Sequence, residues 1–318
     1  MPTRSPGAPR LSVVTPLFNC VAHTQAMVAS LRESIPPGLS HEIILIDDGS
    51  TDGTRDWLAG LGEPFRVILN ERNLGFGGAT NRGAALARGD VLALLNNDLV
   101  LPRGWLQPML RALRSLGRRA GVVGNVQIDA STMEVDHVGI TVNLKGKPEH
   151  ARHLPSRAGI LLRPVRRVFA ATGACLLVRR DTWIRLGGFD ESYVNGCEDV
   201  DLSLRASALG LRNAVALGSR VLHHVSASPG RKLRDEENTM RLVLRWRREL
   251  AVVASRQWAW NHFRAVVPEP RDFPDTGDAL WMALYLARLR RDPPPIALAA
   301  LDGAIDVELA RWKNMISH

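Results

Sequence analysis

The chain has 318 residues, of which 45% are hydrophobic and 23% are charged, and this balance argues against a mostly disordered protein. The formal net charge of +9 predicts a surface that attracts anions such as nucleotide phosphates, nucleic acid or an acidic membrane face, although a generally arginine-rich composition would raise the charge equally. Cys20, Cys175 and Cys197 are odd in number and far apart, which argues against a disulfide framework or a structural zinc site.

The first ten residues predict a disordered tail. They contain three prolines, Arg4 and Arg10, but they lack the apolar core of a secretory signal. No stretch of the sequence has the length and apolar character needed to span a bilayer. We therefore expect a cytoplasmic protein.

Strands and helices alternate over the first third of the chain. Short runs rich in Val, Ile and Leu predict strands, and segments with helical spacing follow them. The predicted strands are residues 11–15, 42–46, 65–69 and 90–95, and the predicted helices are residues 23–33, a segment from Thr51 or Asp52 to Leu61, and residues 77–88. This alternation predicts an α/β fold with a doubly wound, mostly parallel, Rossmann-like sheet.

The pattern loosens between Asp129 and Arg167, where we expect an irregular segment with a hairpin near residues 145–148. Regular patterns return as strands 172–178, 213–217 and 220–222 and as helices 181–186 and 198–209. Beyond Pro229 the sequence predicts a helical appendage, with helices 235–263, 278–290 and 296–315. The expected domains are residues 11–228, with halves 11–128 and 129–228, and a helical region, residues 229–318.

Polar side chains gather where two of the predicted strands end. Asp47 and Asp48 follow the second strand, and Asn96, Asn97 and Asp98 follow the fourth. Ligands of open α/β sheets bind beyond the carboxyl ends of the strands. Mn²⁺ and Mg²⁺ prefer carboxylate oxygens together with substrate phosphates, so Asp98 is the candidate ligand of a divalent metal ion.

A second group of acids lies at the start of the helix predicted for residues 198–209. Asp199 is well presented there to act as a general base toward an incoming hydroxyl group. Glu198 is an alternative base. Both residues are also typical of ordinary acids in the first turn of a helix, where the helix dipole stabilises them.

Two other protein classes deserve comparison. The run GFGGAT, residues 75–80, half-matches a dinucleotide-binding fingerprint and so suggests an oxidoreductase, but the match fails at Thr80 and follows the third strand instead of the first. The positive charge alone suggests a nucleic-acid-binding module. Because the residues at the strand ends are acidic, we expect no nucleic-acid partner.

Eight motifs, in the same order, resemble those of the family 2 glycosyltransferases, which are enzymes of the GT-A fold. The resemblance covers residues 11–228. The motifs are VVTPLFN (13–19), IDDGSTDGT (46–54), NLGFGGATNRG (73–83), ARGDVLALLNND (87–98), GACLLVRR (173–180), GGFDESY (187–193), EDVDLSLR (198–205) and HHVSAS (223–228).

The resemblance implies a site for a nucleotide-sugar donor. Pro16 would begin the first nucleotide-binding loop, and Asp48 would accept a hydrogen bond from the base, although paired turn aspartates often serve only the turn. Asp98 resembles the last acid of the family's DxD motif, the metal ligand that bridges to the diphosphate. Asn97 replaces the usual acid beside it, which removes a negative charge and leaves room for partial dependence on the metal. Further donor-site residues implied by the resemblance are Asn73, Gly75, Gly78 and Asn81.

The resemblance also implies the residues of the catalytic and acceptor side. Asp199 resembles the catalytic base that deprotonates the acceptor while the anomeric carbon is inverted. His223, with Ser228, matches a late element whose histidine completes the metal or diphosphate contact, and His224 is the alternative. The residues that resemble the sugar and acceptor pocket are Gly173, Ala174, Phe189, Asp190 and Glu198.

The resemblance therefore implies an inverting glycosyltransferase with a UDP- or dTDP-linked hexose or deoxyhexose as donor. The expected acceptor is a hydroxyl of a saccharide or lipid-linked molecule in polysaccharide, cell-envelope or glycoconjugate assembly. The alternative is a non-catalytic nucleotide-sugar-binding protein, in which Asn97 reports lost metal chemistry. Residues 157–167 and the basic helix around Trp246 suggest peripheral contact with the inner face of a membrane, or else a solvated basic surface.

Overall fold

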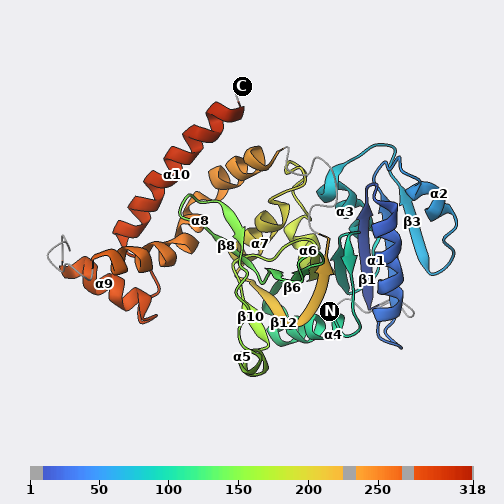
Figure 1. The fold of residues 1–318 in the computed structure, drawn as a ribbon, viewed down its shortest axis with the longest axis horizontal. Coiled ribbons are helices and arrows are strands. Elements are labelled where there is room, and N and C mark those ends of the chain that lie inside the picture. Colours follow the sequence, from blue (N-terminus) through green and yellow to red (C-terminus); the bar gives the residue numbers. More distant parts are fainter. Residues whose placement is uncertain (1–9, 225–233, 267–275, 317–318) are drawn as a thin grey trace. The chain divides into compact units, whose positions relative to one another are not determined.

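The computed structural model describes residues 10–224, 234–266 and 276–316 (Figure 1). The chain forms two compact units. Met1–Ile140 and His150–Arg234 make up the first, here called the sheet unit, and Thr141–Glu149 with Asp235–His318 make up the second, the helical unit. The predicted tail, except Arg10, and the predicted boundary between residues 228 and 229 lie outside the described residues.

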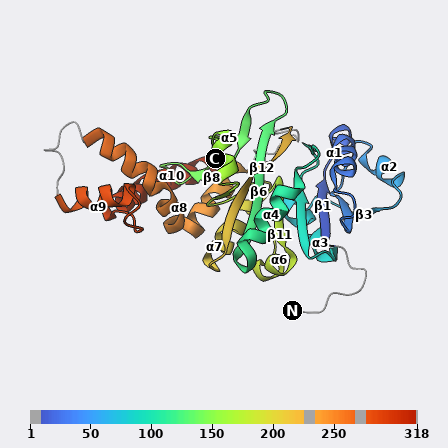
Figure 2. The same cartoon turned by 90° about the horizontal axis from the view of Figure 1, so that it is seen from below.

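A ten-stranded sheet forms the centre of the sheet unit. Its main path runs β10-β12-β6-β11-β4-β1-β2-β3, and Figure 2 shows β12, β6, β11 and β1 in this sequence. All neighbours from β12 to β3 run parallel except β11, which is antiparallel to both β6 and β4. The elements of the first half are β1 (Leu11–Leu17), α1 (Val21–Ser34), β2 (His41–Asp47), α2 (Thr54–Ala59), β3 (Phe65–Leu69), α3 (Gly75–Leu86) and β4 (Val91–Leu95). The predicted α/β fold with a mostly parallel sheet is confirmed.

Helices cover both faces of this sheet because each carries one apolar side. One buried cluster joins the strands to α1, α2 and α4, with Met27, Leu31 and Trp105 fully covered. The other joins them to α3, α6 (Arg180–Leu186) and α7 (Glu198–Ala208). Strands buried on both faces read as continuous apolar runs such as EIILI, which is why the sequence indicated them clearly.

The region after Asp98 was not assigned any element from the sequence, yet it is regular. It contains β5 (Leu99–Val100), α4 (Leu106–Leu116), the 3-10 turn η1 (Gly117–Arg119) and β6 (Ala120–Asp129). Pro108 lies in the first turn of α4, the one part of a helix that tolerates proline. Asn125 and Gln127 interrupt the apolar pattern of β6 although both side chains are fully buried. β6 therefore lacks a simple periodic signal, whereas α4 does carry a helical one, with Leu106, Met109 and Leu113 buried on one side, which the sequence prediction overlooked.

The second half of the sheet unit also differs in detail from the prediction. The two strands expected at residues 213–217 and 220–222 are one strand, β12 (Arg212–His223), with an irregular register against β6 between Ala216 and Arg220. The strand expected from residue 172 begins later, as β11 (Cys175–Arg179). The segment expected to be irregular holds short elements: β7 (Val135–His137), β8 (Ile140–Val142), β9 (Pro148–His150), α5 (Arg157–Leu162) and β10 (Val165–Arg167).

The helical unit contains α8 (Asp235–Val266), which is kinked at Trp246, together with α9 (Thr276–Leu286) and α10 (Pro295–Ile316). The tip of the predicted hairpin, between β8 and β9, belongs to this unit. Lys145 of the hairpin lies 2.9 Å from the carboxylate of Glu308, whose side chain is only 7% exposed. Within the described ranges, no helix is long and apolar enough to cross a membrane.

Candidate active site

One pocket of the sheet unit gathers acidic residues that are far apart in the sequence. Asp48 follows β2, Asp98 follows β4, and Glu198 and Asp199 begin α7; all four side chains line it. The other lining residues are Pro16, Leu17, Phe18, Asn73, Gly75, Phe76, Asn96, Asn97, Thr172, Gly173, Ala174 and Asn195. The pocket thus lies at the carboxyl ends of parallel strands, where an open α/β sheet binds its ligands.

The structure brings most of the predicted site residues to this pocket and leaves some outside it. Those in the lining are Pro16, Asp48, Asn73, Gly75, Asn97, Asp98, Gly173, Ala174, Glu198 and Asp199. Those outside the lining are Gly78, Asn81, Phe189, Asp190 and His223, and of these His223 touches a lining residue, Asp98. Ser228 lies outside the described residues. The roles of all these residues stay predictions.

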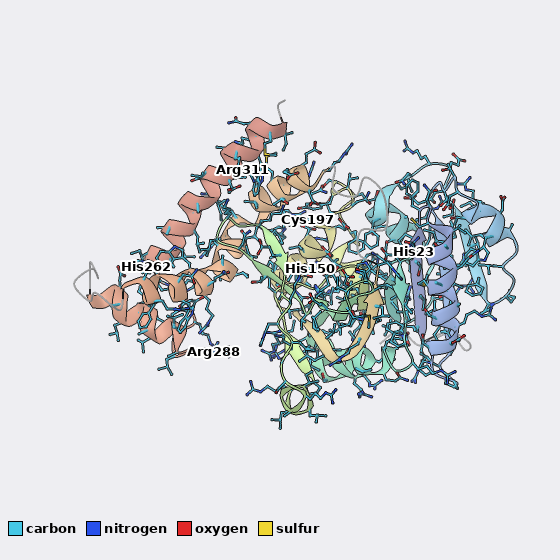
Figure 3. All side chains as sticks on the ribbon, viewed as in Figure 1. His23, His150, Cys197, His262, Arg288 and Arg311 are labelled. Atoms are coloured by element: carbon cyan, nitrogen blue, oxygen red, sulfur yellow. The ribbon has the colours of Figure 1, made fainter. Side chains whose placement is uncertain are left out.

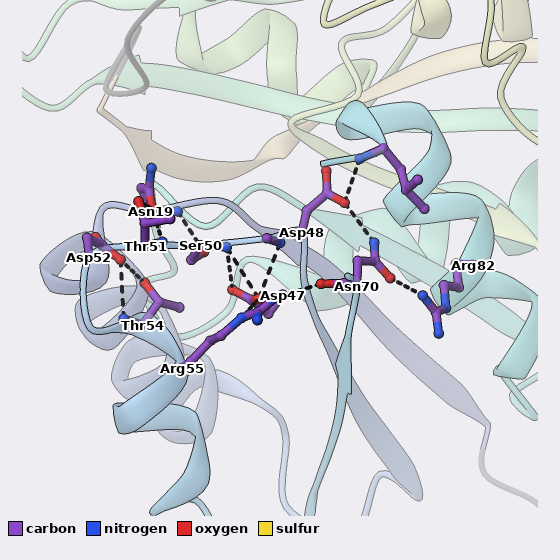
Figure 4. A network of polar contacts seen from close by, with 12 residues as sticks. Asn19, Asp47, Asp48, Ser50, Thr51, Asp52, Thr54, Arg55, Asn70 and Arg82 are labelled. Carbon is purple, nitrogen blue, oxygen red and sulfur yellow. Dashed lines mark hydrogen bonds and ion pairs between the residues drawn. The ribbon is translucent and has the colours of Figure 1, made fainter. Parts of the chain in front are cut away.

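Asp48 is buried and held by three donors. Its Oδ1 accepts hydrogen bonds from Asn70 Nδ2 at 2.7 Å and from the Leu74 amide at 2.9 Å, and its Oδ2 accepts from the Gly75 amide at 2.9 Å (Figure 4). Burial raises the pKa of this carboxyl above its usual value, while the hydrogen bonds act in the opposite direction. The network extends from Asn70 to Arg82.

Asp47 turns away from Asp48, toward Arg55 (Figure 4). Its Oδ2 lies 2.6 Å from Arg55 Nε, and the amide groups of Gly49 and Ser50 point to the same carboxylate. Asp47 is fully buried and absent from the pocket lining. It fixes the turn between β2 and α2, which is the structural role that paired turn aspartates commonly have.

The start of α3 shapes the pocket beside Asp48. Gly75 has a φ of 77°, a conformation that favours glycine, and its amide donates both to Asp48 and to Asn73 Oδ1. Asn81 lies further along α3 and exchanges two hydrogen bonds with the backbone of Phe189, each 2.9 Å long. Asn81 therefore secures the loop that carries Phe189 and Asp190.

Asp98 meets His223 because the backbone pairs around them. β5 runs antiparallel to the end of β12, and the His224 amide donates to the carbonyl of Asp98 at 3.0 Å. His223 Nε2 lies 3.2 Å from Asp98 Oδ1, with side-chain exposures of 3% and 9%. Among the described residues, neither of these atoms has a hydrogen-bond partner. The two buried atoms thus face each other at ion-pair distance without a hydrogen bond, so both are available to a shared ligand.

His224 contacts a different residue from His223. Its ring packs on that of His23 from α1, labelled in Figure 3, with a centroid separation of 4.6 Å. Neighbouring side chains in a strand point to opposite faces, so only one of the two imidazoles can turn toward Asp98. The geometry favours His223 for that position.

Asn96 and Asn97 have contrasting environments next to Asp98. The Oδ1 atom of Asn96 is buried and has no hydrogen-bond partner in the described part of the chain. Asn97 Nδ2 instead donates to Thr24 Oγ1 at 2.9 Å and to the carbonyl of Asn19 at 3.4 Å. Asn97 therefore links the end of β4 to the loop and helix that follow β1.

The N-terminus of α7 presents Asp199 to the opposite side of the pocket. Its Oδ2 accepts a hydrogen bond from the Gly173 amide at 2.7 Å, and its Oδ1 accepts from the Val200 amide. A Cβ on Gly173 would come within 3.2 Å of the Phe76 ring, so a larger residue fits here only if that ring shifts by a few tenths of an ångström. Glu198 is more buried than Asp199, and its Oε2 accepts from the Gly196 amide at 2.6 Å.

Comparison with known proteins now decides the family. Residues 12–181, more than half of the chain, match the family described as Glycosyl transferase family 2. The chain belongs to this family. The chain is 30% identical over 242 residues to N-acetylglucosaminyl-diphospho-decaprenol L-rhamnosyltransferase of Mycobacterium tuberculosis, and the match covers 70% of the chain and 78% of that relative.

A second relative is much longer than this transferase. Uncharacterized protein y4gI of Sinorhizobium fredii is 29% identical over 269 residues, and the match covers 81% of the chain but only 28% of that relative. Among solved structures, GalNAc-T7 with UDP, GalNAc and Mn²⁺ matches with a TM-score of 0.62 at 20% identity, covering 80% of the chain and 51% of that protein. This likeness confirms the predicted GT-A fold.

The donor atoms beside Asp98 fit a divalent cation. Asp98 Oδ1, Asn96 Oδ1 and His223 Nε2 are buried and lack hydrogen-bond partners among the described residues, and carboxylate, amide and imidazole groups are all accepted ligands of Mn²⁺. No group of three His, Cys, Asp or Glu side chains within the described ranges is arranged to hold a metal ion alone. Substrate phosphates would have to supply further ligands, as is usual for Mg²⁺-type sites.

Several residues of the pocket were not predicted from the sequence, namely Leu17, Phe18, Phe76, Thr172 and Asn195. Asn195 has a φ of 56°, and its Oδ1 accepts from the Phe76 amide at 3.0 Å, so it joins the loop before α7 to the start of α3. The dipeptide Asn195-Gly196 was the available signal, because it marks a turn directly before Glu198 and Asp199. The apolar residues carry no comparable signal.

Proposed function

We propose that this family 2 transferase moves a hexose or deoxyhexose from a UDP- or dTDP-linked donor to an acceptor hydroxyl, with inversion at the anomeric carbon. The observation that carries the proposal is the convergence of Asp48, Asp98 and Asp199 on one pocket. A transferase needs to recognise a nucleotide, to neutralise a departing diphosphate and to deprotonate a hydroxyl. One carboxylate is available for each of these tasks.

The donor nucleotide would bind between the loops after β1 and β2 and the start of α3. Asp48 lines this part, and its Oδ2 has one donor among the bonds described above, so it can accept a further hydrogen bond from the base. Pro16, Asn73 and Gly75 line the same side. The three donors that fix Asp48 give the base a rigid partner, which reduces the entropy lost on binding.

Asp98, with His223 and Asn96, would hold a Mn²⁺ or Mg²⁺ ion against the donor diphosphate. The ion would neutralise the negative charge of the leaving nucleoside diphosphate. The structure carrying UDP and Mn²⁺ that shares the fold supports this assignment. Asn97 adds no charge here, so the dependence on the ion need not be absolute.

Asp199 would act as the base. It would take the proton of the acceptor hydroxyl while the acceptor oxygen bonds to the anomeric carbon and the bond from that carbon to the diphosphate oxygen breaks. The Gly173 amide donates to Oδ2 of Asp199 and so holds the carboxylate in place. Glu198, Gly173 and Ala174 would line the acceptor subsite beside it.

We propose that the acceptor is a saccharide carried on a lipid, met at the cytoplasmic face of a membrane during polysaccharide or glycoconjugate assembly. A relative of similar length is named as a transferase acting on an N-acetylglucosaminyl-diphospho-decaprenol, which supports an acceptor of this class. The arginine-rich surface suits a partner that carries phosphates.

Replacement of Asp199 by Asn tests the mechanism. The variant is expected to lose at least about 10³-fold in transfer rate because the base is gone, with nucleotide binding unchanged. Transfer is measured with UDP- and dTDP-sugars, and binding by thermal stabilisation with nucleoside diphosphates with and without Mn²⁺. Glu198→Gln is the matched control. Full activity of Asp199→Asn would refute the assignment. If the unaltered chain binds nucleotides but neither transfers the sugar nor hydrolyses the donor, the non-catalytic alternative is favoured.

A further inference from the structure

A short helix at the margin of the sheet unit exposes two adjacent leucines. Leu161 and Leu162 at the end of α5 are 83% and 82% exposed, and Figure 1 shows α5 beyond β10. The preceding residue, Ile160, packs against one of the buried clusters, and Ser156 caps the helix by accepting from the Gly159 amide. The helix is therefore anchored from within while its apolar end faces solvent, an arrangement that calls for a partner.

The stretch of chain that carries these leucines is basic. No Asp or Glu occurs between His150 and Arg180. Arg157, Arg163 and Arg167 are exposed, and none of them forms an ion pair with another described residue. The charges of Arg167 and Arg119 lower the pKa of Arg212, which is the effect of unbalanced positive charge. An apolar tip with nearby arginines that form no ion pair within the described part of the chain complements an apolar layer lined with phosphates.

The basic helix around Trp246 is a weaker candidate for the same role. Trp246 is only half-exposed, and the Arg245 guanidinium lies over its ring, 5.5 Å from the centroid. Arg247 is bound to Asp302 and Asp306 at 2.5 and 2.6 Å. The positive charge of Arg247 is thus already balanced by two aspartates of the helical unit.

We propose that the α5 patch, defined as Arg157, Leu161, Leu162, Arg163 and Arg167, docks the transferase on an anionic phospholipid bilayer. The two leucines enter the apolar boundary of the bilayer and the arginines pair with headgroup phosphates. Residues 168–171 connect this patch directly to Thr172, Gly173 and Ala174 of the pocket lining. Docking on a bilayer would bring the pocket to the proposed lipid-linked acceptor. The biological purpose of the docking rests on that proposed function, but the docking itself does not.

Vesicle sedimentation tests the docking surface on the full chain. Binding is expected to vesicles of phosphatidylglycerol mixed with phosphatidylcholine at low salt, and to be lost on pure phosphatidylcholine or at high salt. Leu161→Ser with Leu162→Ser should weaken binding at least about tenfold. Arg163→Gln with Arg167→Gln should weaken it about fivefold per arginine.

Two exposed apolar residues of the helical unit provide controls. Val307 is 70% exposed between Asp306 and Glu308, so Val307→Ser should leave vesicle binding unchanged. Leu289, 77% exposed and next to Arg288 and Arg290, tests an alternative location. The proposal is overturned if Leu289→Ser removes binding while the α5 leucine variant keeps it, or if the unaltered chain ignores anionic vesicles.

Two further measurements separate this proposal from its rivals and from the proposed function. Sedimentation velocity would reveal a dimer that the α5 leucine variant disrupts, and that result would assign the patch to a second copy of the chain instead of a membrane. Transfer to a water-soluble acceptor should be unchanged in the same variant. A chain that binds vesicles but transfers no sugar would refute the proposed function and leave the docking surface intact.

Discussion

Asp48 and Asp98 both follow strands of the same sheet, and both are buried in one pocket, yet their surroundings are opposite. Asp48 accepts three hydrogen bonds from within the chain. Asp98 Oδ1 has none from the described residues and faces His223 Nε2, which also has none. The chain itself satisfies the first carboxylate, so that group is fixed before any ligand arrives. The second remains unsatisfied, which is the arrangement expected of an atom whose partner is a ligand.

This contrast separates stability from function within a single pocket. Removing a satisfied carboxylate leaves its donors unpaired and so weakens the fold. Neutralising a carboxylate that accepts no hydrogen bond from the chain leaves no donor unpaired, so the fold should lose little stability. The two aspartates should therefore respond differently to the same substitution.

The largest expected effect is on activity at Asp98. Asp98→Asn keeps the shape of the side chain but removes the charge that would hold the metal, so transfer should fall at least about 10²-fold. The free energy of unfolding should change little, because no donor of the chain loses its acceptor. Initial rates at increasing Mn²⁺ and urea unfolding measure the two quantities, and Asp56→Asn, on the exposed side of α2, is the control. A large loss of stability without loss of transfer would reverse the assignment.

The next effect is on stability at Asp48. Asp48→Ala leaves Asn70 Nδ2 and the amides of Leu74 and Gly75 without their acceptor, which should lower the free energy of unfolding by about 2–4 kcal/mol. Urea unfolding monitored by tryptophan fluorescence measures this. Asp129→Ala serves as control because its carboxylate serves only an exposed local turn. Equal, small losses in both variants would show that the network contributes little.

The burial of Asp48 also predicts how the stability of the protein depends on pH. Burial raises the pKa of Asp48 above the ordinary value of 3.8, so the ionised group disfavours the folded state above that raised pKa. As the pH falls through the raised value toward 3.8, the folded chain takes up the proton first, and the unaltered protein should gain stability relative to Asp48→Asn. Urea unfolding of both proteins from pH 7 to pH 4 tests the sign. A loss of stability of the unaltered protein relative to Asp48→Asn on acidification would contradict it.

The fold was predictable where apolar runs were continuous. β1, β2 and β4 are buried along nearly their whole length, so continuous runs of apolar residues predict them as strands. β6 was not predicted because Asn125 and Gln127 occupy buried positions. β12 was predicted as two strands because it is interrupted before Arg220, where its register against β6 is irregular. Such features depend on partners elsewhere in the sheet and leave no periodic trace.

The candidate site was predictable where strand ends concentrate acids. Asp48, Asp98 and Asp199 all came from that reasoning or from motifs, and the pocket brings them together. The sequence could not separate the roles of Asp47 and Asp48, because the Arg55 contact that occupies Asp47 forms only when α2 folds beside β2. For the same reason it could not find Asn195, which acts through a contact with Phe76 more than a hundred residues away.

The smallest expected effect concerns Asn97, where the sequence departs from the DxD motif that it otherwise resembles. Asn97 Nδ2 donates to the carbonyl of Asn19, and a carboxylate at this position cannot donate, so Asn97→Asp should lower the free energy of unfolding by about 1 kcal/mol. The added negative charge lies next to Asp98 and should lower the Mn²⁺ concentration needed for half-maximal transfer about fivefold, which corresponds to about 1 kcal/mol. Asn97→Ala loses the same hydrogen bonds without adding charge and separates the two effects. An unchanged Mn²⁺ requirement in Asn97→Asp would place the metal away from this side chain, and the asparagine would then serve only to join β4 to α1.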